Sequence, residues 1–127
     1  MKVFQGTPKD EYGEKVNFVD EANVFVGFDM EQDCCEHAGW FIANDITAAV
    51  PDVLNQSTDL DGWLFDRDYF AEVLVQEESF DGGGMVAFRM VKGDAVQYLH
   101  LFNMHNGYYA HGFTMKVGGE ITRDGSV

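Results

Sequence analysis

The chain has 127 residues, of which 46% are hydrophobic, so it is long enough for a single domain with a buried core, and wholesale disorder is excluded. Its formal net charge of −14 argues against nucleic-acid binding through a basic groove, because a field of this sign repels phosphates. No apolar run approaches the roughly 20 residues of a membrane span, and the start of the chain lacks the apolar centre of a signal peptide. These features predict a cytoplasmic protein without a membrane partner.

The first half of the chain predicts strands with little helix. Alternating apolar and polar residues flank a short polar turn, which is typical of a β-hairpin, and a proline weakens the one helical stretch. In order, we expect a loose N-terminal segment at residues 1–14 with a short strand at Val3 and Phe4, a hairpin over residues 15–30 that turns at Asp20-Glu21-Ala22, a short strand from Trp40 to Ala43, a helical turn or two in residues 46–54, and a polar loop at residues 55–62.

The second half predicts a β-meander, because strand-like runs alternate with glycine-containing turns. A two-residue turn at Gly93-Asp94 sets the register of its flanking strands, so the expected pairs are Lys92 with Ala95, Arg89 with Tyr98, and Ala87 with His100. The expected strands are residues 69–78, 85–92, 95–105 and 108–117, followed by a short last strand at 120–123 after Gly118-Gly119. The fold class is therefore mainly β, an antiparallel meander in one domain over residues 1–127, with α+β left open.

Asn106-Gly107 is the strongest hairpin signal in the chain, because both residues tolerate the positive φ of a type I′ turn. A hairpin that turns there pairs Phe102 with His111 and His100 with Phe113. Since side chains alternate between the faces of a strand, His100 and His111 are expected as shielded diagonal neighbours on one face.

A cluster of histidine and cysteine residues gives the chain its candidate metal ligands and nucleophiles: Cys34, Cys35, His37, His100, His105 and His111. The spacing is not that of a zinc site, since there is no C-x-x-C and adjacent cysteines fit one tetrahedral ion poorly. The surrounding acids also raise a thiol pKa rather than lower it. We therefore expect no cofactor and a packing role for these residues, with a metal site or a Cys/His pair as the alternative.

The acidic residues are concentrated in the stretch from Val16 to Asp66, which holds eleven Asp and Glu residues and no Lys or Arg. Such a stretch attracts basic surfaces. The residues expected to bind a protein partner are Asp20, Glu21, Asp29, Glu31, Asp33, Glu36 and Asp45.

Two strings, DCCEHAGWF and YLHLFNMHNGYYAHGF, resemble a family of small uncharacterised proteins of tailed bacteriophages and prophages. The resemblance covers roughly residues 16–127, and HNGYYAHGF is its most distinctive part. It implies a phage setting and the cytoplasm of a host cell. It carries over no activity and no catalytic or binding residue.

Acidity and the phage resemblance together predict a phage-encoded inhibitor that presents a DNA-mimicking surface. The expected target is a host nucleic-acid-handling or defence complex, of the kind that anti-CRISPR and anti-restriction proteins block, with a basic nucleic-acid-binding surface. No direct nucleic-acid contact is expected, and homodimerisation is left open. The alternative is a metal-dependent or Cys/His enzyme that uses His100, His111, Cys34 and Cys35.

Overall fold

A computed structural model of the chain describes residues 1–5, 15–30, 37–73, 84–104 and 111–127. These ranges contain nine β-strands and no helix, which confirms the expected mainly-β fold. The strands are β1 (Lys2–Gln5), β2 (Lys15–Val19), β3 (Val24–Asp29), β4 (His37–Ala43), β5 (Leu64–Val73), β6 (Gly84–Lys92), β7 (Ala95–Met104), β8 (Gly112–Val117) and β9 (Glu120–Ser126). The helical turns expected in residues 46–54 do not form, consistent with the poor fit of Pro51 to a helix interior.

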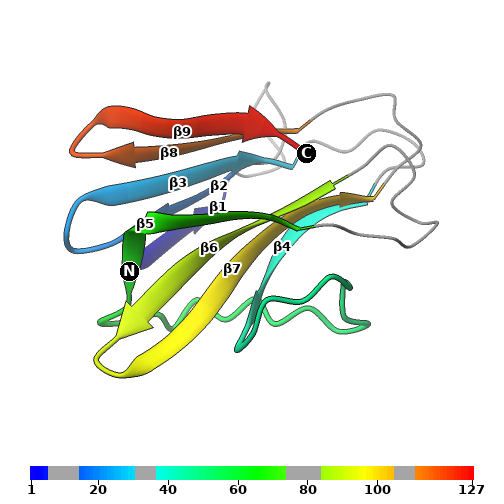
Figure 1. Cartoon of the computed structure of the whole chain (residues 1–127), viewed down its shortest axis with the longest axis horizontal. Helices are drawn as coiled ribbons and strands as arrows, with labels where there is room; N and C mark the ends of the chain where they lie inside the picture. The colour runs from blue at the N-terminus through cyan, green and yellow to red at the C-terminus, as the bar shows by residue number, and fades with distance from the viewer. Residues whose placement is uncertain (6–14, 31–36, 74–83, 105–110) are drawn as a thin grey trace.

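The strands form two antiparallel sheets that face each other across the core (Figure 1). The first sheet has the order β1-β2-β3-β8-β9, and the second has the order β4-β7-β6-β5. Inward-facing residues alternate with half-buried or exposed ones along β2 and β3, as expected for strands with one face on a core.

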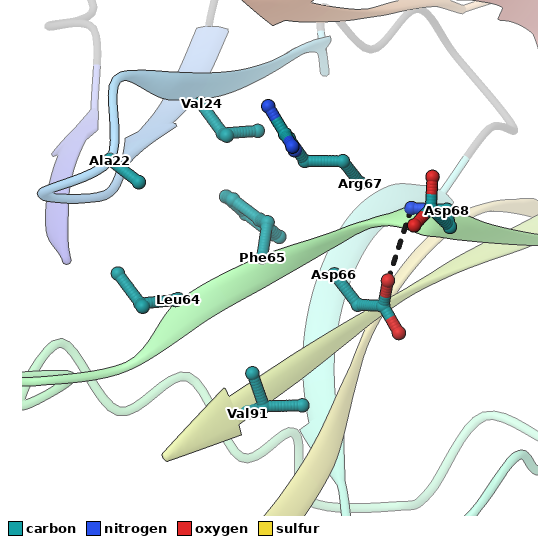
Figure 2. A pocket seen from close by; sticks show the side chains of 8 residues that line it. All are labelled: Ala22, Val24, Leu64, Phe65, Asp66, Arg67, Asp68 and Val91. Carbon is teal, nitrogen blue, oxygen red and sulfur yellow. Dashed lines mark hydrogen bonds between the residues drawn. The ribbon is translucent and has the colours of Figure 1, made fainter. Parts of the chain in front are cut away.

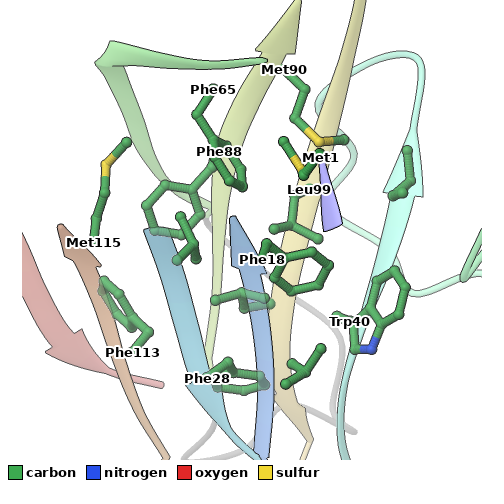
Figure 3. Close-up of a cluster of buried hydrophobic side chains, with 14 of the residues drawn as sticks. Met1, Phe18, Phe28, Trp40, Phe65, Phe88, Met90, Leu99, Phe113 and Met115 are labelled. Carbon is green, nitrogen blue, oxygen red and sulfur yellow. The ribbon is translucent and has the colours of Figure 1, made fainter. Parts of the chain in front are cut away.

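Aromatic side chains from both sheets fill the space between them (Figure 3). The ring of Phe18 in the first sheet meets the ring of Trp40 in the second edge-on, with the centroids 5.0 Å apart. Phe88 meets Phe113 across the same core in a second edge-on contact, at 6.0 Å. Edge-to-face contacts of this kind stabilise a core beyond the area they bury, so these rings help to join the two sheets.

Three of the turns that the sequence predicts are confirmed, and so is the register predicted for one of them, at Gly93-Asp94. The first hairpin pairs β2 with β3, and Asn23 in its turn has φ of 64°. Gly93 has φ of 59°, and β6 pairs with β7 in the expected register, with Arg89 opposite Tyr98. The turn that contains Gly118 and Gly119 likewise joins β8 to β9.

The predicted pairing of residues 95–105 with residues 108–117 is wrong. β7 lies in the second sheet between β4 and β6, whereas β8 lies in the first sheet between β3 and β9. His100 is therefore opposite Phe41 and Ala87, not Phe113. Because β7 has a neighbour on each edge, no edge remains for β8, and the chain crosses to the other sheet. Asn106-Gly107 itself lies outside the described residues.

Residues 44–61, named here the acidic segment, run from β4 toward β5 along the outer side of the second sheet (Figure 1). Val50 and Leu54 pack there against the buried side chain of Phe102 and its neighbours. The amide of Ile42 in β4 donates to the carbonyl oxygen of Asn55 at 2.9 Å, so the segment also closes part of the edge of β4.

Candidate functional site

Asp20 was expected on the binding surface, but its side chain is buried and only 5% exposed. One carboxylate oxygen accepts hydrogen bonds from the amides of Ala22 and Val24, both at 2.9 Å. The other accepts from the amide of Phe65 at 2.8 Å. A carboxylate with three internal donors has a structural role, so Asp20 does not belong to the acidic surface.

The other predicted acids fall into three groups. Glu21 and Asp45 are exposed, as a binding surface requires. Asp29 is half-buried at the end of β3, where its cross-strand neighbour is Lys15. The remaining three, Glu31, Asp33 and Glu36, lie outside the described residues.

The acidic segment carries three further exposed acids, Asp52, Asp59 and Asp61. They lie in the stretch from Val16 to Asp66 that contains no Lys or Arg, but they are not among the predicted site residues. The segment is attached along β4, because the side-chain amide of Gln56 donates to the carbonyl oxygen of Trp40 at 2.9 Å. The absence of Lys and Arg identified the region that contains these three acids, but no sequence pattern distinguished them from the acids that were predicted as site residues.

Val53 and Ile46 lie among these acids and are 85% and 39% exposed. An apolar side chain this exposed is available to a protein partner, whose interface core is depleted in charge. A surface that mimics nucleic acid by charge alone would not require exposed apolar side chains.

Asp66 is removed from the acidic surface by an ion pair. Its Oδ2 accepts from Nε and from a terminal nitrogen of Arg89, at 3.0 and 2.8 Å. Hydrogen bonding from Arg89, with a further bond from the amide of Asp68, lowers the pKa of Asp66 below its usual value. The Arg89 guanidinium also lies 4.3 Å from the centroid of the Tyr69 ring, which fixes it over the second sheet.

An open pocket of about 460 Å³ has Asp66 among its lining residues (Figure 2). Its walls are mainly apolar, and its charged lining residues are consecutive in β5. The lining residues are Ala22, Val24, Leu64, Phe65, Asp66, Arg67, Asp68 and Val91. Two of the eight, Asp66 and Asp68, are carboxylates, and Oδ1 of Asp66 accepts from the amide of Asp68 at 3.0 Å while its Oδ2 is paired with Arg89.

His100 is fully buried on the outer side of the second sheet, stacked on Phe41 with ring centroids 4.5 Å apart. Its Nε2 accepts from the amide of Thr47 at 3.4 Å, while its Nδ1 has no hydrogen-bond partner. Burial lowers the pKa of His100 to about 4, so the ring is neutral at physiological pH.

His111 lies in a different place, beside the first sheet. Its Nδ1 donates to the backbone carbonyl of Asp29 at 2.9 Å, and its ring packs against Phe28. The expectation that His100 and His111 are both shielded is confirmed, since neither is more than 3% exposed. Their placement as diagonal neighbours is wrong, because His100 lies in β7 of the second sheet, whereas His111 directly precedes β8 of the first.

Cys34, Cys35 and His105 lie outside the described residues, as does the side chain of His37. Within the part of the chain that the structure describes, no three His, Cys, Asp or Glu side chains are grouped as metal ligands would be. No helix of that part is long and apolar enough to cross a membrane. Comparisons with protein families, with curated proteins and with solved structures find no match to this chain.

Proposed function

We propose that this chain is a binding protein that docks its acidic segment on a basic, nucleic-acid-binding surface of another protein. One observation carries the proposal: four acids, Asp45, Asp52, Asp59 and Asp61, are exposed along a single segment within a stretch that contains no Lys or Arg. Affinity for nucleic acid depends largely on phosphate neutralisation, and carboxylates that occupy the same basic surface compete with phosphates for it.

The attachment of the segment supports this role. Hydrogen bonds to β4 and the packing of Val50 and Leu54 hold the acidic segment against the second sheet. A segment that is ordered before binding loses less conformational entropy when it binds. The strings that resemble phage proteins support a target in the host, in a nucleic-acid-handling or defence complex.

The alternative, a metal-dependent or Cys/His enzyme, is less favoured. His100 and His111 are its central pair, but His100 lies in β7 of the second sheet and His111 directly precedes β8 of the first. Nε2 of His100 is already bonded to the amide of Thr47, and Nδ1 of His111 is already bonded to the backbone carbonyl of Asp29.

Amide substitutions in the acidic segment test the proposal. The partner is captured from host lysate, identified and purified, and its binding kinetics are then measured. Neutralising the four exposed acids is expected to slow association at least about tenfold, because charge attraction acts mainly on the rate of encounter. The test variant carries Asp45→Asn, Asp52→Asn, Asp59→Asn and Asp61→Asn.

The matched control removes the same charge from exposed acids elsewhere: Asp68→Asn, Glu72→Gln, Asp94→Asn and Glu120→Gln. A smaller effect in this control, of about threefold or less, would show that position matters as well as net charge. The partner should also release bound DNA or RNA as the wild-type protein is added. Equal effects of the two variants, salt-independent binding, or full nucleic-acid affinity at saturation would contradict the proposal.

A further inference from the structure

The first sheet ends at the edge strand β9, whose residues after a bulge at Thr122 pair regularly with β8 and have an open outer edge in the part of the chain that the structure describes. β1 is only four residues long, β4 is partly closed by Asn55 and Gln56, and β5 is interrupted by a bulge between Phe65 and Phe70. β9 has seven residues, every one of them exposed, and β8 is its only neighbour in the part of the chain that the structure describes. An edge of this kind is a template for a further strand.

The hydrogen bonds at the end of β9 show which of its backbone groups point outward. His111 and Val127 exchange two bonds, each of 2.9 Å. Bonded and non-bonded pairs alternate along an antiparallel ladder, so Gly125 and Arg123 also direct their backbone groups toward β8. Asp124 and Ser126 lie between them, and their N–H and C=O groups therefore point away from the sheet.

A second copy of β9 is a poor occupant of this edge. In a symmetric antiparallel pair, one residue must lie opposite its own copy. An axis at Arg123 or at Asp124 brings like charges together, and an axis at Thr122 places Glu120 opposite Asp124. An axis at Gly125 places Asp124 opposite Ser126 without such a clash, so the net charge of the two molecules is what opposes that register. The formal charge of −14 on each molecule adds further repulsion.

We propose that β9 is a docking edge for an extended, basic segment of the partner protein, which joins the first sheet as a sixth strand. The basic character of the segment rests on the proposed function and on the charge of the whole chain, whose field favours positive ligands. Backbone bonds to Asp124 and Ser126 provide the contact, as in other cases of strand addition.

A labelled peptide of about seven residues with alternating lysine and valine serves as the probe, since it is basic and forms strands readily. Its control is the same peptide with N-methyl groups on alternate residues, which keeps the charge and removes backbone donors. The protein variants are Ser126→Pro and Ser126→Ala. Proline removes an outward N–H and leaves the bonds to β8 in place, so the fold should be retained, as unchanged circular dichroism and melting would show.

Ser126→Pro is expected to weaken peptide binding at least about tenfold, and Ser126→Ala to change it less than about twofold. In the wild-type protein, the peptide should slow hydrogen exchange at the amides of Asp124 and Ser126, a result that does not depend on any variant. Equal binding of the two peptides, or no change in exchange at these amides, would overturn the docking edge. Self-association of the wild type that Ser126→Pro abolishes would overturn it as well, in favour of a second copy.

Failure of this inference can be separated from failure of the proposed function. If the acidic-segment variant loses binding to the partner while Ser126→Pro retains it, the function stands and the β9 edge does not. If Ser126→Pro loses peptide binding while the acidic-segment variant binds the partner like its matched control, the edge stands and the function does not.

Discussion

Replacing Asp20 with alanine is expected to lower the free energy of unfolding by about 3 kcal/mol, because it leaves three backbone donors without their acceptor in a buried position. These donors are the amides of Ala22, Val24 and Phe65. Hydrogen bonds to a charged acceptor contribute more than neutral ones, and their losses are not additive, so the figure is below the sum of three separate bonds. Chemical denaturation in urea at neutral pH measures the change.

The effect on stability is expected to be large because the three hydrogen bonds connect parts of both sheets. Two of them hold the turn between β2 and β3 in the first sheet, and the third reaches the start of β5 in the second. Asp20→Asn should be less destabilising than Asp20→Ala, because an amide oxygen can still serve the turn. Glu21→Ala, at the exposed neighbouring residue, should change stability by less than about 0.5 kcal/mol. If the free energy of unfolding of Asp20→Ala differs from that of the wild type by less than about 0.5 kcal/mol, these three hydrogen bonds contribute little to stability.

The sequence predicts local pairing well and long-range pairing poorly, and the two sides of β7 show why. The Gly93-Asp94 turn fixes the register of β6 and β7, since two residues leave few ways to connect two strands. Which strand lies on the other side of β7 depends on contacts far along the chain. The structure buries five consecutive residues of β7, as expected of a strand with both faces covered, but His100 and Asn103 interrupt the apolar residues among them, so the sequence shows this only weakly.

The acidic site was predictable as a region and not residue by residue. The absence of Lys and Arg between Val16 and Asp66 identifies the region from sequence alone. Composition does not distinguish a solvated carboxylate from one that caps a turn, so Asp20 was misplaced. Its position directly before a turn is the local sign of a carboxylate that bonds to nearby backbone amides. The path of the acidic segment along β4 depends on hydrogen bonds that no sequence pattern shows.

Acidification is expected to destabilise the fold through His100, because its pKa is about 4 in the folded protein and near 6.5 in an unfolded chain. Burial is the cause, since it penalises the charged ring. The unfolded chain therefore takes up the proton first as the pH falls. The contribution to stability is fully present above about pH 6.5 and is lost between pH 6.5 and about 4, with a total of about 3 kcal/mol.

His100→Phe is the control, because phenylalanine can stack on Phe41 and carries no titrating group. It also removes the acceptor of the Thr47 amide, a cost that does not vary with pH. The stability advantage of wild type over this variant should shrink by about 2 kcal/mol from pH 7 to pH 4.5, measured by urea denaturation. Because the folded ring stays mostly neutral until the pH approaches about 4, the bond from Thr47 to Nε2 should persist over most of this range, and protection of that amide, corrected for the intrinsic exchange rate, should fall only near pH 4. A difference between the two proteins that stays constant over this pH range would show that His100 accepts a proton in the folded state as readily as in the unfolded chain.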